Sequence, residues 1–243
     1  MRPRSGGSAT GTVREMAGIE DLKRAIDQTL LKPTVGFRDG AAWIEANRDE
    51  GFASLCISPF LVPIASQLLA GSTTLVCSVA GFPLGYANTE SKAEEAGLLV
   101  ALGCVEVDMV MNFAALLEGE DAFVRDDVRA VVDCVREASE GRAKVKVILE
   151  TGHLAEADIA RGCMLAVEAG AHFVKTSTGF GPRGASVRDV EIMRATVGSE
   201  VGVKAAGGIR DLDAALAMIE AGADRLGTSA GGEIVAEARN RGL

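Results

Sequence analysis

The sequence predicts a single α/β domain folded as a (β/α)8 TIM barrel, on three observations. The chain has 243 residues, close to the usual length of such a barrel. Eight short β-type runs alternate with amphipathic helical stretches, which favours a parallel sheet, and eight units favour its closure. A weak repeat agrees, because Gly51, Gly103, Gly170 and Gly222 each end a helical stretch shortly before a strand. A doubly wound sheet is the alternative, since such helix ends occur in any α/β fold.

The strands are predicted from short apolar runs that are bounded by Gly, Asp, Ser or Thr. In chain order they are Ala25–Leu30, Ala53–Ile57, Thr74–Val79, Val105–Met111, Lys144–Glu150, His172–Ser177, Val201–Ala205 and Asp224–Thr228. The clearest helices cover residues 120–141 and 212–222, where apolar residues recur at i, i+3 and i+4.

The N-terminal residues differ from the rest of the chain. Residues 1–18 are rich in Gly, Ser and Thr and lack the apolar core of a secretory signal, so we expect a flexible, mobile tail. The barrel domain is expected over residues 19–243 and begins with a short helix. No run reaches the roughly 18 apolar residues of a membrane span.

Composition narrows the classes of partner. The 48% hydrophobic and 24% charged residues are ordinary globular values, which exclude general disorder. A net charge of −9 disfavours binding to nucleic acid. It still allows an anionic small molecule, because a pocket can be locally positive. Five cysteines without a C-x-x-C pair favour a reducing, cytoplasmic location.

Charged residues interrupt five of the predicted strands, although parallel strands covered on both faces normally read as continuous apolar runs. These residues are Asp27, Asp108, Lys146, Lys175 and Lys204. Strand alternation would place the last four inside the barrel on consecutive strands, with Asp27 facing them.

Several buried lysines would disfavour protonation of one another, and desolvation acts in the same direction. One amine is then expected to be neutral near pH 7, as an amine nucleophile must be. The alternative is that each lysine extends to water from a strand end. From the residues alone, Lys146, Lys175 and Lys204 all remain candidates for the nucleophile.

The loops after the last strands indicate a phosphate site. Lys175 is followed by Thr-Ser-Thr-Gly, and Lys204 by Gly207, Gly208 and then Asp211, a good helix N-cap. The eighth strand runs into Gly-Thr-Ser-Ala-Gly-Gly. Glycines let backbone N–H groups approach an anion, and these loops often bind phosphate in (β/α)8 barrels.

Other chemistries lack their motifs. The two histidines, His153 and His172, form no metal-binding pattern, so a zinc site is not expected. The chain also lacks the G-x-x-x-x-G-K-[ST] and G-x-S-x-G motifs. Nucleotide phosphoryl transfer and a serine hydrolase therefore have no support.

Seven segments resemble the deoxyribose-phosphate aldolase family, over about residues 19–238. They are IDQTLLKP, GFPLG, VDMVMN, KVILETG, FVKTSTGF, VKAAGGIR and RLGTSAG. The resemblance implies a metal-free class I aldolase without a cofactor. Such a lyase, active in deoxyribonucleotide catabolism in the cytoplasm, reversibly cleaves 2-deoxy-D-ribose 5-phosphate to D-glyceraldehyde 3-phosphate and acetaldehyde. We expect no nucleic-acid or membrane partner, and a homodimer only because dimers are the commonest assembly.

The resemblance also implies residue roles. Lys175 is the Schiff-base nucleophile, Lys204 keeps it deprotonated, and Asp108 transfers protons with the help of water. Lys146 belongs to the same interior network. Substrate binding is assigned to two sets: Asp27, Thr29 and Thr178 at the sugar hydroxyl, and Gly179, Gly207, Gly208 and Ser229 at the phosphate.

Three departures from the family pattern are visible. Phe180 stands where some members have Lys, so Arg183 is a candidate replacement at the phosphate. Gln28 stands where His is common, which we expect to change only supporting hydrogen bonds. Tyr86 is the only tyrosine, so the C-terminal tyrosine of some members is missing.

Two alternatives stay open at this point. One is a class I aldolase for another phosphorylated sugar or keto acid, with the same lysine and a different pocket. The other is a non-catalytic barrel that binds a phosphometabolite. A binding pocket has no use for three interior lysines, which argues against the second alternative.

Overall fold

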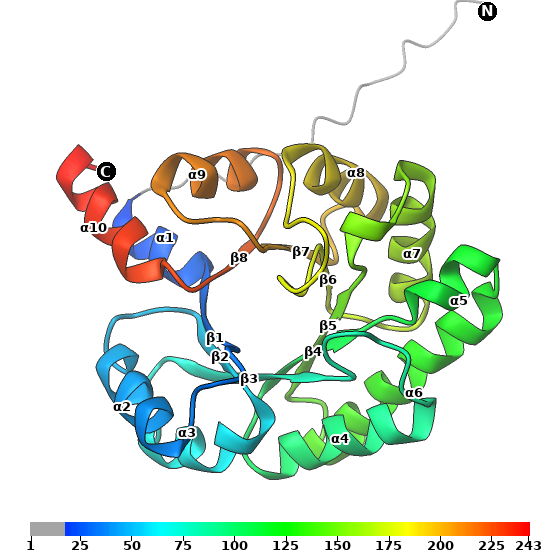
Figure 1. The fold of residues 1–243 in the computed structure, drawn as a ribbon, viewed down its shortest axis with the longest axis horizontal. Coiled ribbons are helices and arrows are strands. Elements are labelled where there is room, and N and C mark those ends of the chain that lie inside the picture. Colours follow the sequence, from blue (N-terminus) through cyan, green and yellow to red (C-terminus); the bar gives the residue numbers. More distant parts are fainter. Residues whose placement is uncertain (1–17) are drawn as a thin grey trace, which may run out of the picture.

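The computed structural model describes residues 18–243, in which eight parallel strands form one closed barrel in chain order (Figure 1). The barrel fold predicted from the sequence is confirmed, and the doubly wound alternative is wrong. The strands are β1 Ile26–Leu30, β2 Ser54–Ile57, β3 Leu75–Ala80, β4 Glu106–Val110, β5 Lys144–Ile148, β6 Phe173–Lys175, β7 Gly202–Ala206 and β8 Arg225–Thr228. The bounds of each strand lie within two residues of its predicted range.

Helices surround the barrel as an outer ring (Figure 1). They are α1 Ile19–Ala25, α2 Phe37–Asn47, α3 Val62–Leu68, α4 Thr89–Ala101, α5 Phe113–Glu118, α6 Asp121–Ser139, α7 Glu156–Glu168, α8 Val187–Val197, α9 Leu212–Glu220 and α10 Gly231–Arg241. Two short 3-10 turns cover Pro59–Leu61 and Thr151–His153. The short helix expected before the first strand is α1, whereas the predicted tail lies, apart from Gly18, outside the described residues. None of the described helices combines the length and apolarity that a membrane crossing requires.

Helix ends follow the glycine repeat. Gly51, Gly103, Gly170 and Gly222 have φ angles of 84°, 107°, 90° and 109°, the left-handed conformation that stops a helix. At the N-terminal end of α9, the Asp211 carboxylate accepts a hydrogen bond from the Ala214 N–H at 2.8 Å and caps the helix. These local signals end the helices before β2, β4, β6 and β8 and begin α9 after β7.

The strand register sets the height of each interior lysine. Asp108 is level with Lys146, and Lys175 is level with Lys204. Lys146 is level with Phe173, two residues before Lys175 on the same strand. Lys175 therefore lies nearer the C-terminal ends of the strands than Lys146 does, at the end of the barrel where active sites of this fold are built.

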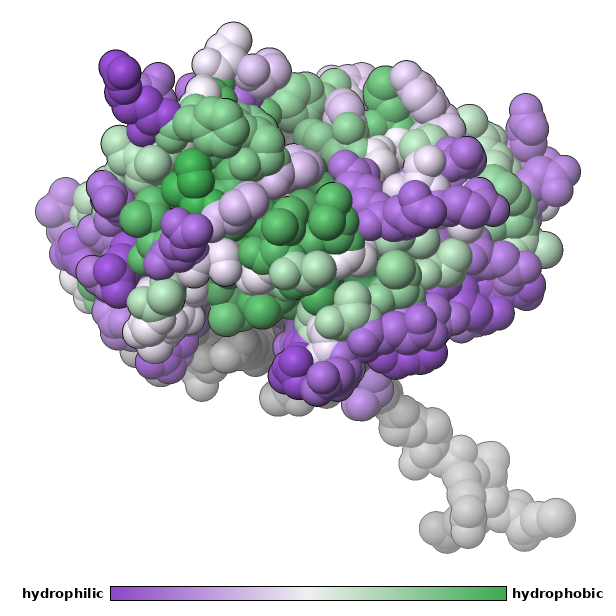
Figure 2. Space-filling view, turned by 90° about the horizontal axis from the view of Figure 1, so that it is seen from below, coloured by the Kyte–Doolittle hydropathy of each residue, from purple (hydrophilic) through white to green (hydrophobic). Residues whose placement is uncertain are grey.

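Apolar surface remains on the outside of the molecule. Figure 2 shows apolar side chains gathered in patches between polar ones on one side. Across the described residues, large exposed apolar side chains include Phe37, Tyr86 and Leu98, which are 61%, 71% and 61% exposed. The homodimer expected from the sequence stays a prediction.

A buried ion pair holds the loop after β3 against the barrel. Lys92 of α4 pairs with Asp127 of α6, and both side chains are almost completely buried. The same ammonium donates hydrogen bonds to the carbonyl of Gly85 at 3.1 Å and to that of Val110 at 3.4 Å. Gly85 has a φ of 72°, and a Cβ there would lie 2.2 Å from the Met111 carbonyl oxygen. Lys92 thus ties α4, α6 and the end of β4 together.

We expect Lys92→Met to lower the free energy of unfolding by about 3–5 kcal/mol, because it leaves the Asp127 carboxylate buried without a counter-charge. Urea unfolding at pH 7 measures the change. Lys92→Met combined with Asp127→Leu should recover most of the loss. Arg142→Met is the control, because Arg142 and its partner Glu140 are 72% and 80% exposed and should contribute about 1 kcal/mol or less. A similar loss in Lys92→Met and in the control would contradict the interpretation.

Candidate active site

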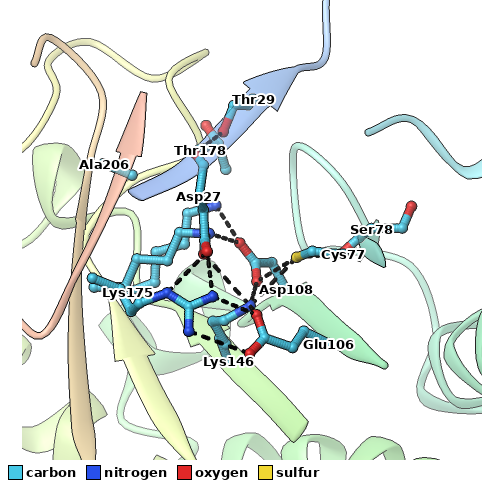
Figure 3. A network of polar contacts seen from close by, with 12 residues as sticks. Asp27, Thr29, Cys77, Ser78, Glu106, Asp108, Lys146, Lys175, Thr178 and Ala206 are labelled. Carbon is cyan, nitrogen blue, oxygen red and sulfur yellow. Dashed lines mark hydrogen bonds and ion pairs between the residues drawn. The ribbon is translucent and has the colours of Figure 1, made fainter. Parts of the chain in front are cut away.

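The charged residues predicted inside the strands meet in the barrel interior (Figure 3). The Asp108 carboxylate lies among three ammonium groups: its Oδ2 is 2.7 Å from Nζ of both Lys175 and Lys204, and its Oδ1 is 2.9 Å from Nζ of Lys146. All four residues are 3% exposed or less. The alternative that the lysines extend to water is therefore wrong. Asp27, from β1, completes the predicted set with Oδ2 2.6 Å from Nζ of Lys204.

Two further charged residues belong to this network and were not predicted. Glu106 is buried, with Oε2 2.7 Å from Nζ of Lys146 and 2.8 Å from Nη2 of Arg225. Arg225, at the start of β8, also donates hydrogen bonds to Asp27 Oδ1. Glu106 was foreseeable, because it precedes Asp108 by two residues and so shares its face of the strand. Arg225 gave no such signal, because its strand β8 holds no second charged residue that would mark the interior face.

The network holds one more cation than carboxylate. Its cations are Lys146, Lys175, Lys204 and Arg225, and its carboxylates are Asp27, Glu106 and Asp108. Because a guanidinium stays protonated, the network becomes neutral only if one lysine loses its proton. Lys146 contacts three of the carboxylates and Lys204 two, but Lys175 contacts only Asp108. A neutral Lys175 therefore gives up the fewest ion pairs.

The carboxylates in the network are held ionised. Burial alone would raise the pKa of Asp108, but the three neighbouring ammonium groups outweigh it and hold that pKa well below its usual value. Burial likewise opposes ionisation of Asp27, yet Lys204, Lys146 and Arg225 lower its pKa. A protonated carboxylic acid at either position is therefore disfavoured at neutral pH.

The expectation that the neighbouring lysines lower one another's pKa is wrong for Lys204 and Lys146. Burial lowers the pKa of Lys204, but Asp108 and Asp27 outweigh both burial and the repulsion from Lys146, so the pKa is raised. The pKa of Lys146 is also raised, because Asp108 and other anionic groups outweigh its burial. The sequence showed that the lysines would cluster but did not show how many carboxylates each would contact.

Two thiols line the network beside Asp108. Cys77 Sγ lies 3.4 Å from Asp108 Oδ1 and 3.4 Å from Lys146 Nζ. Cys56, Cys77 and Asp108 place their ligand atoms within 4.8 Å of one another. These residues do not fit a divalent cation, because the three ammonium groups around Asp108 would repel the metal ion. Burial also raises the pKa of Cys77, which disfavours the thiolate that a metal needs.

Three glycine loops lie at the C-terminal ends of β6, β7 and β8. Gly179, Gly207 and Gly208 have φ angles of 88°, 86° and 82°, which only glycine adopts readily. A Cβ on Gly207 would lie 2.9 Å from the Gly184 Cα, so the loops after β6 and β7 touch. Gly179, Gly208 and Ser229 are exposed to solvent. The predicted phosphate residues thus sit at one end of the barrel, and three of the four are exposed.

Two of the three departures from the family pattern, Phe180 and Gln28, have defined surroundings, and so does Arg183. Phe180 packs edge-to-face on Phe82, with ring centroids 5.4 Å apart. Arg183 is bonded to the Asp189 carboxylate and, at 3.0 Å, to the Thr151 carbonyl, which does not support its use at a phosphate. The Gln28 side-chain oxygen accepts a hydrogen bond from the Gly231 N–H at 3.0 Å.

Two predicted substrate residues and the two histidines complete the picture. The Thr29 hydroxyl donates to the Asp27 carbonyl at 2.9 Å, and the Thr178 hydroxyl donates to the buried Glu150 carboxylate. His172 Nδ1 accepts a hydrogen bond from the Val145 N–H at 3.1 Å, and His153 stacks on Phe113. The histidines thus have structural contacts.

Known proteins match this chain over nearly its whole length. Residues 22–237 match the model of a family described as "DeoC/LacD family aldolase". A deoxyribose-phosphate aldolase of Alkaliphilus oremlandii is 49% identical over 215 residues, 88% of this chain and 95% of the relative. One from Caldanaerobacter subterraneus subsp. tengcongensis is 46% identical and covers 95% of this chain and 99% of its own.

Solved structures agree. A putative deoxyribose-phosphate aldolase from Coccidioides immitis superposes with a TM-score of 0.87 at 38% identity, covering 96% of this chain and 92% of its own. The deoxyribose phosphate aldolase from Aeropyrum pernix, described as having a unique tetrameric structure, gives 0.85 at 31% identity, over 93% of this chain and 94% of its own.

We expect Asp27→Asn to make the free energy of unfolding fall less steeply as the pH drops below about 4. Because the folded-state pKa of Asp27 lies below its ordinary value of 3.8, its ionisation stabilises the fold above about pH 4, and this contribution is lost as the pH falls further. The lost dependence is at most about 1.4 kcal/mol per pH unit. Urea midpoints at pH 7, 5, 4 and 3 measure it. Asp49→Asn, at a side chain that is 87% exposed, is the control; parallel acid limbs for wild type and Asp27→Asn would refute the expectation.

Proposed function

This chain belongs to the DeoC/LacD family of aldolases, and on that premise we propose that it is a deoxyribose-phosphate aldolase that acts through a Schiff base on Lys175. The observation that carries the proposal is the unequal charge of the buried network, four cations against three carboxylates. A neutral lysine amine is what addition to an aldehyde requires.

The proposed reaction begins with the open-chain sugar phosphate. The Lys175 amine adds to the aldehyde carbon, and the resulting carbinolamine loses water to give a protonated imine. The bond between C2 and C3 then breaks, its electron pair moves toward the imine nitrogen, and the C3 hydroxyl loses its proton. This releases D-glyceraldehyde 3-phosphate and leaves an enamine. Protonation of the enamine carbon and hydrolysis of the imine release acetaldehyde and free Lys175.

Asp108 is the proposed proton carrier for these steps, with water as its relay. Its carboxylate is in direct contact with Nζ of Lys175 at 2.7 Å and is held ionised by the surrounding lysines. Because a protonated Asp108 is disfavoured, we propose that it takes up a proton next to the reacting nitrogen only transiently and passes it through water to the enamine carbon. Lys204 and Lys146 remain cations in this scheme, because the carboxylates raise the pKa of each. Their charge keeps the network neutral when Lys175 has lost its proton.

The phosphate is proposed to bind at the glycine loops after β6, β7 and β8. Support comes from the exposed Gly179, Gly208 and Ser229 and from the positive φ angles of the glycines. Backbone N–H groups and the start of α10 would supply the positive potential, so that a side-chain cation is not required. Asp27 lies fully buried below these loops, so we propose that it supports the charged network and contacts the sugar only through its neighbours.

Location, metal independence and substrate are parts of the same proposal. The five cysteines are free thiols, which fits the reducing cytoplasm. Another phosphorylated sugar or keto acid remains the alternative substrate, and no feature of the site favours it over deoxyribose 5-phosphate. Activity that survives EDTA would agree with a metal-free reaction, and loss of activity would contradict it.

We expect borohydride in the presence of acetaldehyde to trap a covalent adduct on Lys175. Reduction of the imine adds a stable ethyl group, which peptide mass spectrometry assigns to a residue. Nearly complete modification of Lys175 should accompany loss of activity, and omission of acetaldehyde is the control. An adduct on Lys146 or Lys204 alone, or on no lysine, would be incompatible with the proposed nucleophile.

We expect Lys204→Leu to lower kcat/KM at pH 7 by roughly 10- to 1,000-fold, the effect of a neighbouring charge on an ionisation equilibrium. Without Lys204 the network is neutral when Lys175 is protonated, so the rising limb of the pH–rate profile should move to higher pH. Lys144→Leu is the matched control, because Lys144 lies exposed on β5. A profile that keeps its wild-type position would rule out this role for Lys204.

A further inference from the structure

Glu150 has no place in the reaction described above, yet its position is unusual. It lies two residues after the end of β5 and is only 2% exposed. Its backbone is left-handed, with φ 58° and ψ 59°. Among the described residues, Glu140 is the one other non-glycine residue with a positive φ, and Glu140 lies at an exposed helix end. A strained backbone that keeps a carboxylate buried suggests a function for that carboxylate.

The contacts of Glu150 converge on one residue. Its carboxylate accepts the Thr178 N–H at 3.3 and 3.4 Å and also accepts the Thr178 hydroxyl. Within residues 18–243 it forms no direct ion pair with Lys or Arg, but it is close enough to Arg183 for its charge to help raise the pKa of that guanidinium. The loop after β6 closes over the carboxylate, since a Cβ on Gly181 would lie 2.8 Å from it. Thr178 is therefore the main hydrogen-bonding partner of this buried charge.

These contacts fix the direction of the Thr178 hydroxyl. A threonine hydroxyl has one hydrogen to donate and two lone pairs that accept. The hydrogen is donated to Glu150, and one lone pair accepts the Phe180 N–H at 3.0 Å. What remains is a single lone pair. An ionised carboxylate can only accept, so the hydroxyl cannot reverse while Glu150 is its partner.

We propose that Glu150 is a positioning residue that makes Thr178 an obligate hydrogen-bond acceptor and thereby selects a substrate with a donor hydroxyl. This inference rests on the proposed function and on the assignment of Thr178 to the sugar. It adds the reason why a hydroxyl, and not a carbonyl, is accepted at that position.

The chemistry of the cleavage indicates which hydroxyl Thr178 contacts. The C3 oxygen loses its proton and becomes the aldehyde oxygen, so a partner that can only accept would repel it as negative charge develops. The C4 hydroxyl does not react and keeps its proton throughout. An acceptor such as Thr178 therefore fits the C4 hydroxyl, which in the reverse direction is the hydroxyl beside the aldehyde of D-glyceraldehyde 3-phosphate.

The test compares two acceptor aldehydes in condensation with acetaldehyde. D-Glyceraldehyde 3-phosphate has a hydroxyl beside the aldehyde, and hydroxypyruvaldehyde phosphate has a carbonyl there, which can only accept. The ratio of the two kcat/KM values is the acceptor preference. Comparison of this ratio between variants cancels the different intrinsic reactivity of the two aldehydes.

Glu150→Gln should lower the preference for the hydroxyl by roughly 10-fold or more. The Gln oxygen can accept the Thr178 N–H while its NH2 group donates to the Thr178 hydroxyl, which turns the hydroxyl hydrogen toward the substrate. The change should appear mainly in KM for the two acceptors. Thr178→Val should also lower the preference, and adding Glu150→Gln to Thr178→Val should change it no further, because Glu150 acts through Thr178.

Glu140→Gln is the matched control, because it makes the same substitution at the other left-handed glutamate and should leave the preference unchanged. A Glu150→Gln enzyme with a lower melting temperature and the wild-type preference would show a merely structural role and overturn the proposal. If Glu150→Gln does not fold, Thr178→Val carries the test, and an unchanged preference in that variant overturns the proposal equally.

Failure of this inference is distinguishable from failure of the proposed function. An enzyme that forms the Lys175 adduct and condenses both aldehydes, but whose preference ignores Glu150, retains the proposed function and loses only the role of Glu150. A wild-type protein that forms no adduct and condenses neither aldehyde loses both.

Discussion

One carboxylate, that of Asp108, is shared by three lysines inside a closed barrel, and the rest of the site follows from this arrangement. No single ammonium could be buried there unpaired, because desolvation would cost several kcal/mol. Asp27, Glu106 and Arg225 are then needed to pair the groups that Asp108 leaves incompletely satisfied. The barrel interior, which in this fold usually holds branched apolar side chains, is here partly filled by charge. Because that charge is uneven, one amine can be neutral in a protein whose surface is acidic.

The fold was predictable from the sequence because its strands and helices follow simple local rules. The centre of the site was predictable because its charged residues break one of those rules. Strand and helix periods, with glycine stops, located all eight strands, and Lys146, Lys175 and Lys204 were conspicuous as charges within apolar runs. Arg225 was not predictable, since its partners are close only after the barrel closes. The protonation preferences of Lys146 and Lys204 were predicted in the wrong direction for the same reason, because repulsion can be inferred from the sequence but the distances to carboxylates cannot. Lys92 and Asp127 lie on helices among other charged residues, so no local pattern distinguishes them from surface residues.

The groups for proton transfer and imine formation lie in a different layer of the barrel from the groups that recognise the sugar phosphate. The lysines and carboxylates form a buried layer in which proton transfer and imine formation can occur away from bulk water. The glycine loops and Thr178 lie above it, toward the exposed C-terminal ends of the strands, and they supply uncharged hydrogen-bond donors and acceptors. Hydrogen bonds of fixed direction suit the sugar and phosphate, because they discriminate by geometry without disturbing the charge balance below. Glu150 connects the layers, since it lies two residues after the end of β5, the strand of Lys146.

The ion pair between Arg225 and Asp27 joins the last strand to the first and thereby links the charged network to the order of synthesis. A growing chain contains all three lysines before it contains Arg225. Until β8 docks against β1, the β1 edge is unpaired, and Asp27 and Glu106 lack the guanidinium that they share. The charged network is therefore complete only in a closed barrel. A chain without β8 would contain Lys175 but lack the guanidinium that Asp27 and Glu106 share.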